Sequence, residues 1–209
     1  SSDVCSSDLI ILDGPYSNSA FDIVCKNDKV YMIIGGKDLL NGKRFDKGGY
    51  ILTYDYDKWS FIDPKEAQKK LNLPRNPRDY TSIAVTTDDS NDEIVYASSM
   101  GDGVIQYKNG TPVQSYNEKN AFKETAGGYG SGYCYIDGLA FDKNGNLWMT
   151  SSEVNHAVLV LDKAGAWHRL DIEQLRGVYT INDILITSTN DKWIYVPRNT
   201  PKLVMIPNS

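Results

Sequence analysis

The chain has 209 residues, in which 22 Lys and Arg stand against 27 Asp and Glu, and its formal net charge is −5. The basic residues form no block or stripe, which argues against nucleic-acid binding, and no apolar run approaches the roughly 18 residues that cross a membrane. The 14 Tyr and 4 Trp fall largely in short β-like runs, without long helical patterns. The composition therefore predicts an all-β protein with a substantial core.

The first nine residues, Ser1 to Leu9, are not expected to belong to the fold. The segment SSDVCSSDL back-translates without a mismatch onto a common sequencing adapter, so we interpret it as a scar rather than a disordered terminus. We therefore expect the natural N-terminus, with any signal peptide, to lie outside this sequence. Of the remaining cysteines, Cys25 and Cys134 each lie within or beside an apolar run and are predicted to be buried thiols rather than a disulfide.

Groups of short apolar runs, separated by turn residues, follow one another along the chain. The runs of the first group are Ala20–Cys25, Val30–Ile34, Tyr50–Tyr54 and Trp59–Ile62. Those of the second are Ser82–Val85, Ile94–Ser98, Val104–Tyr107 and Val113–Tyr116. Those of the third are Leu139–Phe141, Leu147–Thr150, Val158–Leu161 and Ala166–Leu170. The last group has three runs: Ile181–Ile186, Trp193–Val196 and Leu203–Ile206.

The spacing of these groups predicts the architecture. Trp59, Val113 and Trp167 lie in the fourth run of three successive groups, at equal intervals. A period near roughly 50 residues with four strands per repeat is typical of a β-propeller blade, whereas an all-β sandwich would not explain the recurrence. We predict a partial β-propeller of about four four-stranded antiparallel blades, which span residues 18–63, 80–117, 135–171 and, incompletely, 180–209. Because four units do not close a ring comfortably, we expect the chain to be a segment of a larger propeller.

The links between the predicted blades carry helix signals. Asp63 can cap a helix whose first position is Pro64, and Glu66 completes a capping-box pattern. Residues 171–177 suggest one or two helical turns that end at Gly177, and residues 118–125 a further helix. These short helices, with an insertion over Lys37–Gly48, should decorate one face of the ring.

The third group carries a motif with a family resemblance. Its Gly145-Asn146-Leu147-Trp148 sits in residues 138–152, which resemble the two-component regulator propeller repeat. The longer run of residues 133–172 is similar to PorZ-type surface proteins of the type IX secretion system in Bacteroidetes. The other groups carry tyrosine where this one has Trp148. The motif itself is predicted to form hairpin and core rather than a functional site.

The resemblance implies a non-enzymatic module of a cell-envelope protein, located at the outer-membrane surface or in the periplasm. PorZ-type proteins help to deliver anionic lipopolysaccharide, so the expected partners are a glycan or lipopolysaccharide and proteins of the secretion system. Related propellers form periplasmic sensor regions of hybrid two-component histidine kinases, which is an alternative function. The resemblance implies no cofactor.

Ligand-binding residues are expected where the chain enters each inner strand, because those loops surround the mouth of a propeller's channel. Aromatic side chains beside Asp, Asn and Arg suit a sugar, and arginine suits phosphate or carboxylate. The loops after the second strands join the same rim. The predicted rim residues are Arg78, Asp79, Tyr80, Tyr133, Tyr135, Asp137, Asn182, Asp183 and Arg198. Each of them has a structural alternative, because such residues also cap loops and pack between blades.

A propeller enzyme of the lyase or lactonase type is the competing hypothesis. It needs a metal or an acid–base group at the channel mouth, and Asp137, Asn182 and Asp183 are the sequence features that suggest one. Convergence of these three side chains would favour the enzyme. The acidic run of residues 88–93 lacks the spacing of an EF-hand loop and is predicted to be a solvated hairpin tip. His156 and His168 lie in no nucleophile pattern and are predicted to be surface residues.

Overall fold

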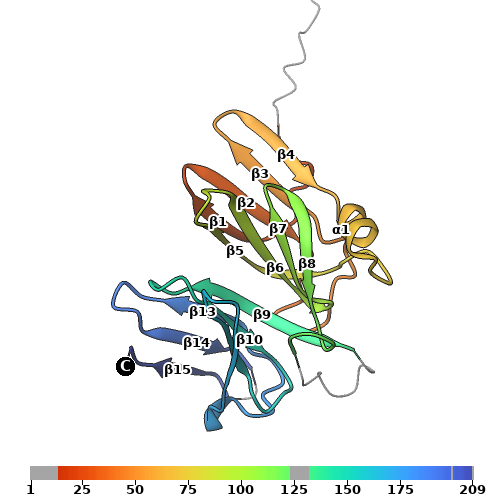
Figure 1. The fold of residues 1–209 in the computed structure, drawn as a ribbon. Helices are drawn as coiled ribbons and strands as arrows, with labels where there is room; N and C mark the ends of the chain where they lie inside the picture. The colour runs from red at the N-terminus through yellow and green to blue at the C-terminus, as the bar shows by residue number, and fades with distance from the viewer. Residues whose placement is uncertain (1–13, 123–131, 199, 209) are drawn as a thin grey trace, which may run out of the picture.

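A computed structural model of the chain describes residues 14–122, 132–198 and 200–208 (Figure 1). The segment interpreted as a scar lies outside the described residues, as does the end of the helix expected at 118–125. The described part is built from antiparallel strands, in agreement with the predicted all-β class. No helix in these three ranges combines the length and apolarity needed to cross a lipid bilayer.

The first unit is a four-stranded sheet in the order β1-β2-β3-β4. Its strands are β1 (Ala20–Lys26), β2 (Lys29–Ile34), β3 (Ile51–Asp55) and β4 (Lys58–Ile62). Asn27 and Asp28 join β1 to β2 with φ of 51° and 59°, the left-handed conformation that a two-residue hairpin needs. The loop between β2 and β3 contains the predicted insertion, residues 37–48.

The second and third units are also four-stranded meanders. The second consists of β5 (Tyr80–Thr87), β6 (Glu93–Gly101), β7 (Gly103–Lys108) and β8 (Thr111–Tyr116). The third consists of β9 (Cys134–Phe141), β10 (Leu147–Ser151), β11 (Val158–Leu161) and β12 (Trp167–Leu170). The two units form one eight-stranded sheet, because the last residues of β6 pair with the first residues of β9, Met100 with Tyr135 and Gly101 with Cys134. The sequence did not predict this junction, which arises because β6 runs beyond its hairpin partner.

The fourth unit is a three-stranded sheet in the described residues. It contains β13 (Asp183–Ile186), β14 (Lys192–Val196) and β15 (Lys202–Ile206). The residues alternate between buried and exposed along β14 and between half-buried and exposed along β15, so one face packs on the third unit. The other face exposes Leu185, Trp193 and Leu203.

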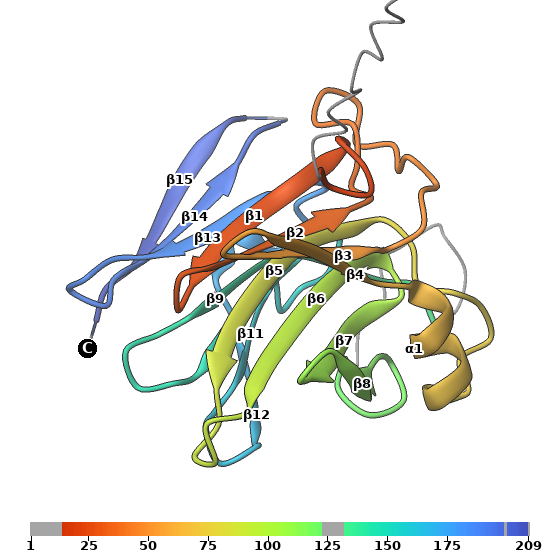
Figure 2. The ribbon, with the colours of Figure 1, turned by 90° about the horizontal axis from the view of Figure 1, so that it is seen from above.

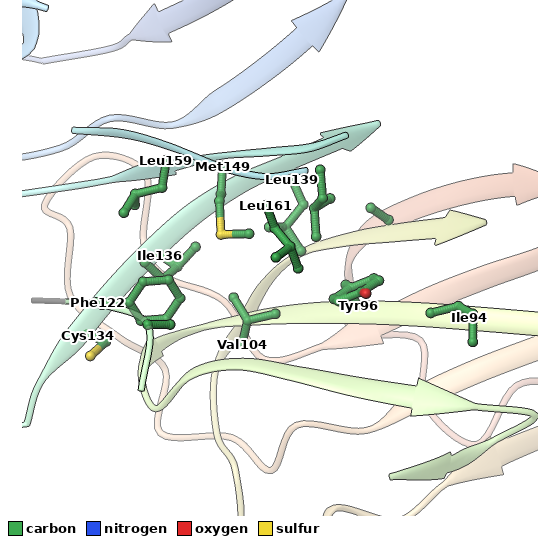
Figure 3. Close-up of a cluster of buried hydrophobic side chains, with 13 residues drawn as sticks. Ile94, Tyr96, Val104, Phe122, Cys134, Ile136, Leu139, Met149, Leu159 and Leu161 are labelled. Carbon is green, nitrogen blue, oxygen red and sulfur yellow. The ribbon is translucent and has the colours of Figure 1, made fainter. Parts of the chain in front are cut away.

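The first strands of the four units lie side by side: β5 contacts both β1 and β9, and β9 contacts β13 (Figure 2). The apolar cores lie between successive units. One joins Tyr31 and Ile33 to Ile83 and Val95, and the next lies between the second and third units (Figure 3). A third packs Val158 of the third unit against the fourth. Each sheet is thus covered by its neighbour in the chain, which is a propeller-like arrangement.

The links differ in how well they match the predicted helices. The helix α1 (Pro64–Leu71) begins as predicted: Asp63 accepts a hydrogen bond from the Lys65 N–H (2.9 Å), and Pro64 opens the first turn. The link after β12 forms one 3₁₀ turn, η1 (Glu173–Leu175), with no side-chain cap. This link therefore has the shorter of the two predicted helix lengths. In the link between the second and third units, the described residues 118–122 form a turn rather than the predicted helix.

Two further predictions can be compared with the structure. Gly145 and Asn146 form the turn between β9 and β10: Gly145 has φ of 83°, and Asn146 donates its backbone N–H to Asp142 (2.9 Å). The motif therefore builds a hairpin, as predicted. Both cysteines outside the scar are free, but only Cys134 is buried. The prediction that Cys25 is buried is wrong, because its side chain lies on the outer side of β1.

Candidate functional site

One end of the molecule gathers the links between units and the loops that follow β2, β6, β10 and β14. This arrangement follows from the meander: every unit begins at this end and returns to it after two strands, and the three four-stranded units return again after their fourth. We call this end the rim, and the opposite end, where the tight hairpins lie, the tip end. The predicted ligand residues all belong to segments near the rim.

Asp79 fixes the insertion of residues 37–48 at the rim. Its carboxylate accepts hydrogen bonds from the N–H groups of Asp46 (3.1 Å) and Lys47 (3.0 Å) and lies 3.3 Å from Arg44 Nε. Asp79 is fully buried and has φ of 47°. Burial raises the pKa of the Asp79 carboxyl, and the Lys47 N–H and Arg44 oppose that rise. Asp79 therefore positions a loop and is not exposed to a ligand.

A buried ion pair connects the first unit to the third and fourth. Lys37, in the insertion, pairs with Asp137 of β9, and both side chains are almost completely buried. Ser152 donates its hydroxyl to Asp137 (2.5 Å) and accepts the N–H of Ile181 (2.8 Å), while Lys37 Nζ donates to the Ile181 carbonyl (3.3 Å). Burial raises the pKa of Asp137 to about 6, and Lys37 and Ser152 oppose the rise. This cluster holds three units together below the rim surface.

An open groove of about 370 Å³ lies on the rim between the link that precedes the second unit and the link that follows it. Arg75 spans it and donates Nε to Asp102 (2.9 Å), which also accepts the backbone N–H of Arg78 (3.1 Å). Tyr133 forms one wall; a Cβ on Gly101 would lie 2.8 Å from its ring, so only glycine permits this approach. The groove therefore combines an aromatic side chain with paired charged groups.

The structure brings most of the predicted rim residues to this end, at different depths. Asp79, Tyr135 and Asp137 are buried below its surface, and Tyr133 is buried except for the 7% of its surface that remains exposed beside the groove. Arg78 and Asp183 are exposed, and Asn182 and Arg198 are half-buried. The Arg198 guanidinium lies 5.8 Å from the centre of the Tyr179 ring. The residues brought together thus form an outer layer of two arginines and an aspartate over a buried polar layer.

Tyr80 is corrected from a rim residue to a core residue. It is fully buried, and its hydroxyl lies 2.6 Å from that of Tyr107. Because β5 begins at Tyr80, its side chain points between the first and second sheets rather than into the loops.

Several residues that shape the rim were missed by the sequence reasoning. Lys37 and Arg44 lie in the insertion, and Arg75 and Asp102 come from two separate loops. The lone Lys37 directly after the apolar strand and Gly35-Gly36 is a weak signal for a buried cation. No local pattern connects Arg75 to Asp102.

The side chains that suggested an enzyme do not form a metal group in the structure. The Asp137 carboxylate forms an ion pair with Lys37 and accepts a hydrogen bond from Ser152. Asp183 Oδ1 accepts the N–H of Ile184 (2.8 Å). Within the described ranges, no three His, Cys, Asp or Glu side chains are placed to hold a metal ion. Although the residue as a whole is exposed, the protein atoms packed around the Asp183 carboxyl and the nearby charge of Asp22 raise its pKa.

The acidic run of residues 88–93 forms a hairpin tip. Lys108 Nζ lies 2.8 Å from Asp88 and 2.7 Å from Asp92, and these contacts lower the pKa of both carboxyls. At the third unit, exposed His168 pairs with Asp162 (2.7 Å).

The fold is β-propeller-like, and it resembles solved structures of a bacterial surface component and of extracellular domains. PorZ, an essential bacterial surface component of the type IX secretion system of Porphyromonas gingivalis, matches with a TM-score of 0.75 and 21% identity, over 94% of this chain and 26% of PorZ. Extracellular domains of two hybrid two-component systems from B. thetaiotaomicron match with TM-scores of 0.54 and 0.51 and identities of 16% and 15%. Each match covers 91% of this chain and 21% or 27% of the other.

The chain therefore spans about a quarter of the length of these structures. No family model matches the chain, and no curated protein matches it in sequence. The likeness to PorZ and to the two-component domains agrees with the resemblance found from the Gly-Asn-Leu-Trp motif. At sequence identities of 15–21%, this structural likeness establishes the fold alone.

Proposed function

We propose that the chain is part of a β-propeller in a bacterial cell-envelope protein, and that it binds a ligand at the rim without catalysing a reaction. Its four units are then consecutive blades, with residues 18–63, 80–117, 135–171 and 180–209 as their extents. The likeness to a surface component and to extracellular domains supports the envelope location. The groove beside Tyr133 is the observation that carries the proposal.

The groove suits an anionic glycan such as the saccharide part of lipopolysaccharide. Tyr133 offers an aromatic surface, and Asn117 and Ser115 line the groove with groups that bond to hydroxyls. The charges that line the groove balance, with Arg75 and Lys119 against Asp102 and Glu118. The excess positive charge comes from Arg78 beside the groove, whose side chain is 47% exposed and lies 3.9 Å from Asp46. Arginine binds phosphate and carboxylate by paired hydrogen bonds, which favours an acidic sugar over a neutral one.

A sensor region is a second candidate, since the two-component extracellular domains share the fold. The same rim would then bind a glycan and report it to another part of the protein. The two candidates share the ligand-binding step and differ in whether binding delivers the glycan or transmits a signal. A protein partner of a secretion system is a different occupant of the rim and is one outcome of the binding test.

The test measures binding of purified smooth and rough lipopolysaccharide to the full chain by biolayer interferometry. The double variant Arg78→Ala/Lys119→Ala should weaken binding by about tenfold or more, because two phosphate or carboxylate contacts are lost. The matched control Lys26→Ala/Lys58→Ala removes two exposed charges at the tip end and should leave binding unchanged. Equal effects of both variants, or no binding by the unaltered chain, would refute the rim as a glycan site, and capture of secretion-system proteins alone would favour a protein partner.

A further inference from the structure

A second groove lies at the tip end, on the face opposite the rim. Its volume is about 690 Å³, and it lies between the second and third units, among the hairpin tips at residues 87–89, 143–145 and 162–165. It is separate from the rim groove, and no residue lines both. We call it the tip groove.

The tip groove exists because the second and third units diverge away from the rim. In the described residues, backbone pairing joins their sheets at the rim end of β6 and β9, through Met100, Gly101 and the following Asp102. The first and second units diverge in the same way, but there Glu93 accepts Lys29 Nζ (2.8 Å) and the Tyr31 hydroxyl (2.5 Å). That bridge divides the space into smaller pockets of about 470 and 200 Å³, both lined by Lys29 and Glu93.

No comparable bridge is seen in the tip groove among the described residues. The ion pair across its mouth joins Lys163 to Asp89 at 3.1 Å, with side chains 67% and 90% exposed. Such an exposed pair contributes little and gives way easily to a ligand. The space between the second and third units therefore stays open where the neighbouring space is bridged.

Aromatic rings form the floor of the tip groove. Tyr96 and Tyr116 lie nearly parallel, with ring centres 6.4 Å apart and an angle of 22°, and Phe141 meets Tyr96 edge-on at 5.9 Å. Tyr116 donates its hydroxyl to Gln106 (2.9 Å), which fixes the ring. Tyr96 belongs to the same apolar cluster as Val104 of β7 and Ile94 of β6 (Figure 3). The floor thus offers fixed apolar ring faces next to polar groups.

The walls carry charges that cancel. The lining has three lysines and three aspartates, namely Lys108, Lys143, Lys163, Asp88, Asp89 and Asp162. Lys108 is held between two tip carboxylates, and Asp162 is paired with His168. Without an excess of either sign, the groove gives no electrostatic advantage to an anion or a cation. Its charged and amide groups can still donate and accept hydrogen bonds along the wall.

We propose that the tip groove binds a short, uncharged oligosaccharide. Pyranose rings combine apolar faces, which pack on aromatic side chains, with hydroxyls that both donate and accept hydrogen bonds. The groove falls in the size range of small-ligand sites, about 300–1,000 Å³. An acidic glycan gains nothing from balanced walls, and a peptide does not need the aromatic floor together with so many polar groups. This site is independent of the one proposed at the rim.

The test uses saturation-transfer NMR on the full chain, with maltotriose, cellotriose and mannotriose as uncharged ligands and sialyllactose as an anionic one. At least one uncharged trisaccharide should bind. The variant Tyr116→Leu removes a floor ring and should weaken binding about tenfold, whereas Tyr116→Phe keeps the ring and should retain most of it. Asn144→Trp, at an exposed turn position that lines the groove, should block binding without disturbing the core.

The rim variant Arg78→Ala/Lys119→Ala separates the two sites. It should leave trisaccharide binding intact even if lipopolysaccharide binding is lost. The proposal is overturned if no uncharged trisaccharide binds, if binding survives Asn144→Trp, if the rim variant abolishes it, or if sialyllactose binds more tightly than every uncharged sugar.

Discussion

Replacing Lys37 with Met should destabilise the protein strongly at pH 8 and little at pH 5. The substitution removes the cation that pairs with Asp137, a side chain with no exposed surface. Breaking a buried ion pair by removing one partner costs about 3–5 kcal/mol, because an uncompensated charge stays buried. For a chain of this length, that loss lowers the melting temperature by roughly 10 °C.

The pH dependence follows from the raised pKa of Asp137, which is about 6 because of burial. In the unfolded chain this carboxyl has its ordinary, lower pKa. Its contribution to stability is therefore fully present below pH 4 and is lost as pH rises through about 6, a change of about 3 kcal/mol. Removing Lys37 raises the pKa of Asp137 further. The free energy of unfolding of the variant therefore falls most at the pH values at which this carboxyl ionises. At pH 5 the carboxyl is largely protonated, and the cost should fall toward zero.

The assay is urea unfolding followed by tryptophan fluorescence at both pH values, for Lys37→Met, Asp137→Asn and the double variant. At pH 8 the double variant should cost about 2 kcal/mol less than the sum of the single variants, because it leaves no unpaired charge. Strictly additive effects, or a Lys37→Met cost that is the same at pH 5 and pH 8, would show that Lys37 and Asp137 do not form a buried pair.

Three further predictions concern a turn, a contact between units and the burial of a thiol. Asp142→Ala should lower the free energy of unfolding, measured in urea, by about 2–3 kcal/mol. The substitution removes the acceptor of the Trp148 indole N–H (3.0 Å) and of the turn N–H groups of Asn144 and Asn146. A loss below roughly 0.5 kcal/mol, as at a surface site, would contradict these hydrogen bonds. Gly35→Ala should lower the free energy of unfolding by at least about 2 kcal/mol more than Gly165→Ala does. Both glycines have positive φ, but only at Gly35 would a Cβ lie 2.4 Å from the Tyr80 nitrogen. Equal losses of stability would argue against this contact between the end of β2 and β5. Alkylation at pH 8, mapped by mass spectrometry, should label exposed Cys25 but not Cys134, whose pKa burial raises to about 12; rapid labelling of Cys134 in the folded chain would place β9 at the surface.

Local sequence signals predicted the strands and turns of this fold well. The Asn-Gly turn before Leu147 and the Asp63-Pro64 start of α1 both arise from contacts within a few residues, which sequence reasoning can recognise. The equal spacing of Trp59, Val113 and Trp167 likewise reports a repeated unit. The joining of β6 to β9 was not predicted, because it depends on how two units dock rather than on either strand alone.

The site was predicted in position but not in its contacts. The topology of a meander fixes which loops share one end, so Arg78, Tyr133 and Asp137 were expected there. Their partners come from far along the chain, as Lys37 does for Asp137, and neither length nor composition of a loop specifies such a pairing. The prediction of Tyr80 as a rim residue was wrong for a related reason. Its position at the start of a strand can be predicted from the sequence, but the direction of its side chain is set by packing against the neighbouring sheet.

Hydrogen–deuterium exchange of the full chain with and without lipopolysaccharide tests the central proposal most directly, because it locates the ligand without any substitution. We predict slower exchange in the rim segments around residues 73–78, 101–102 and 115–119, with the hairpin tips at 88–91 and 143–145 unchanged. Protection confined to the tips or to the exposed face of β13–β15, with none at the rim, would contradict the proposal.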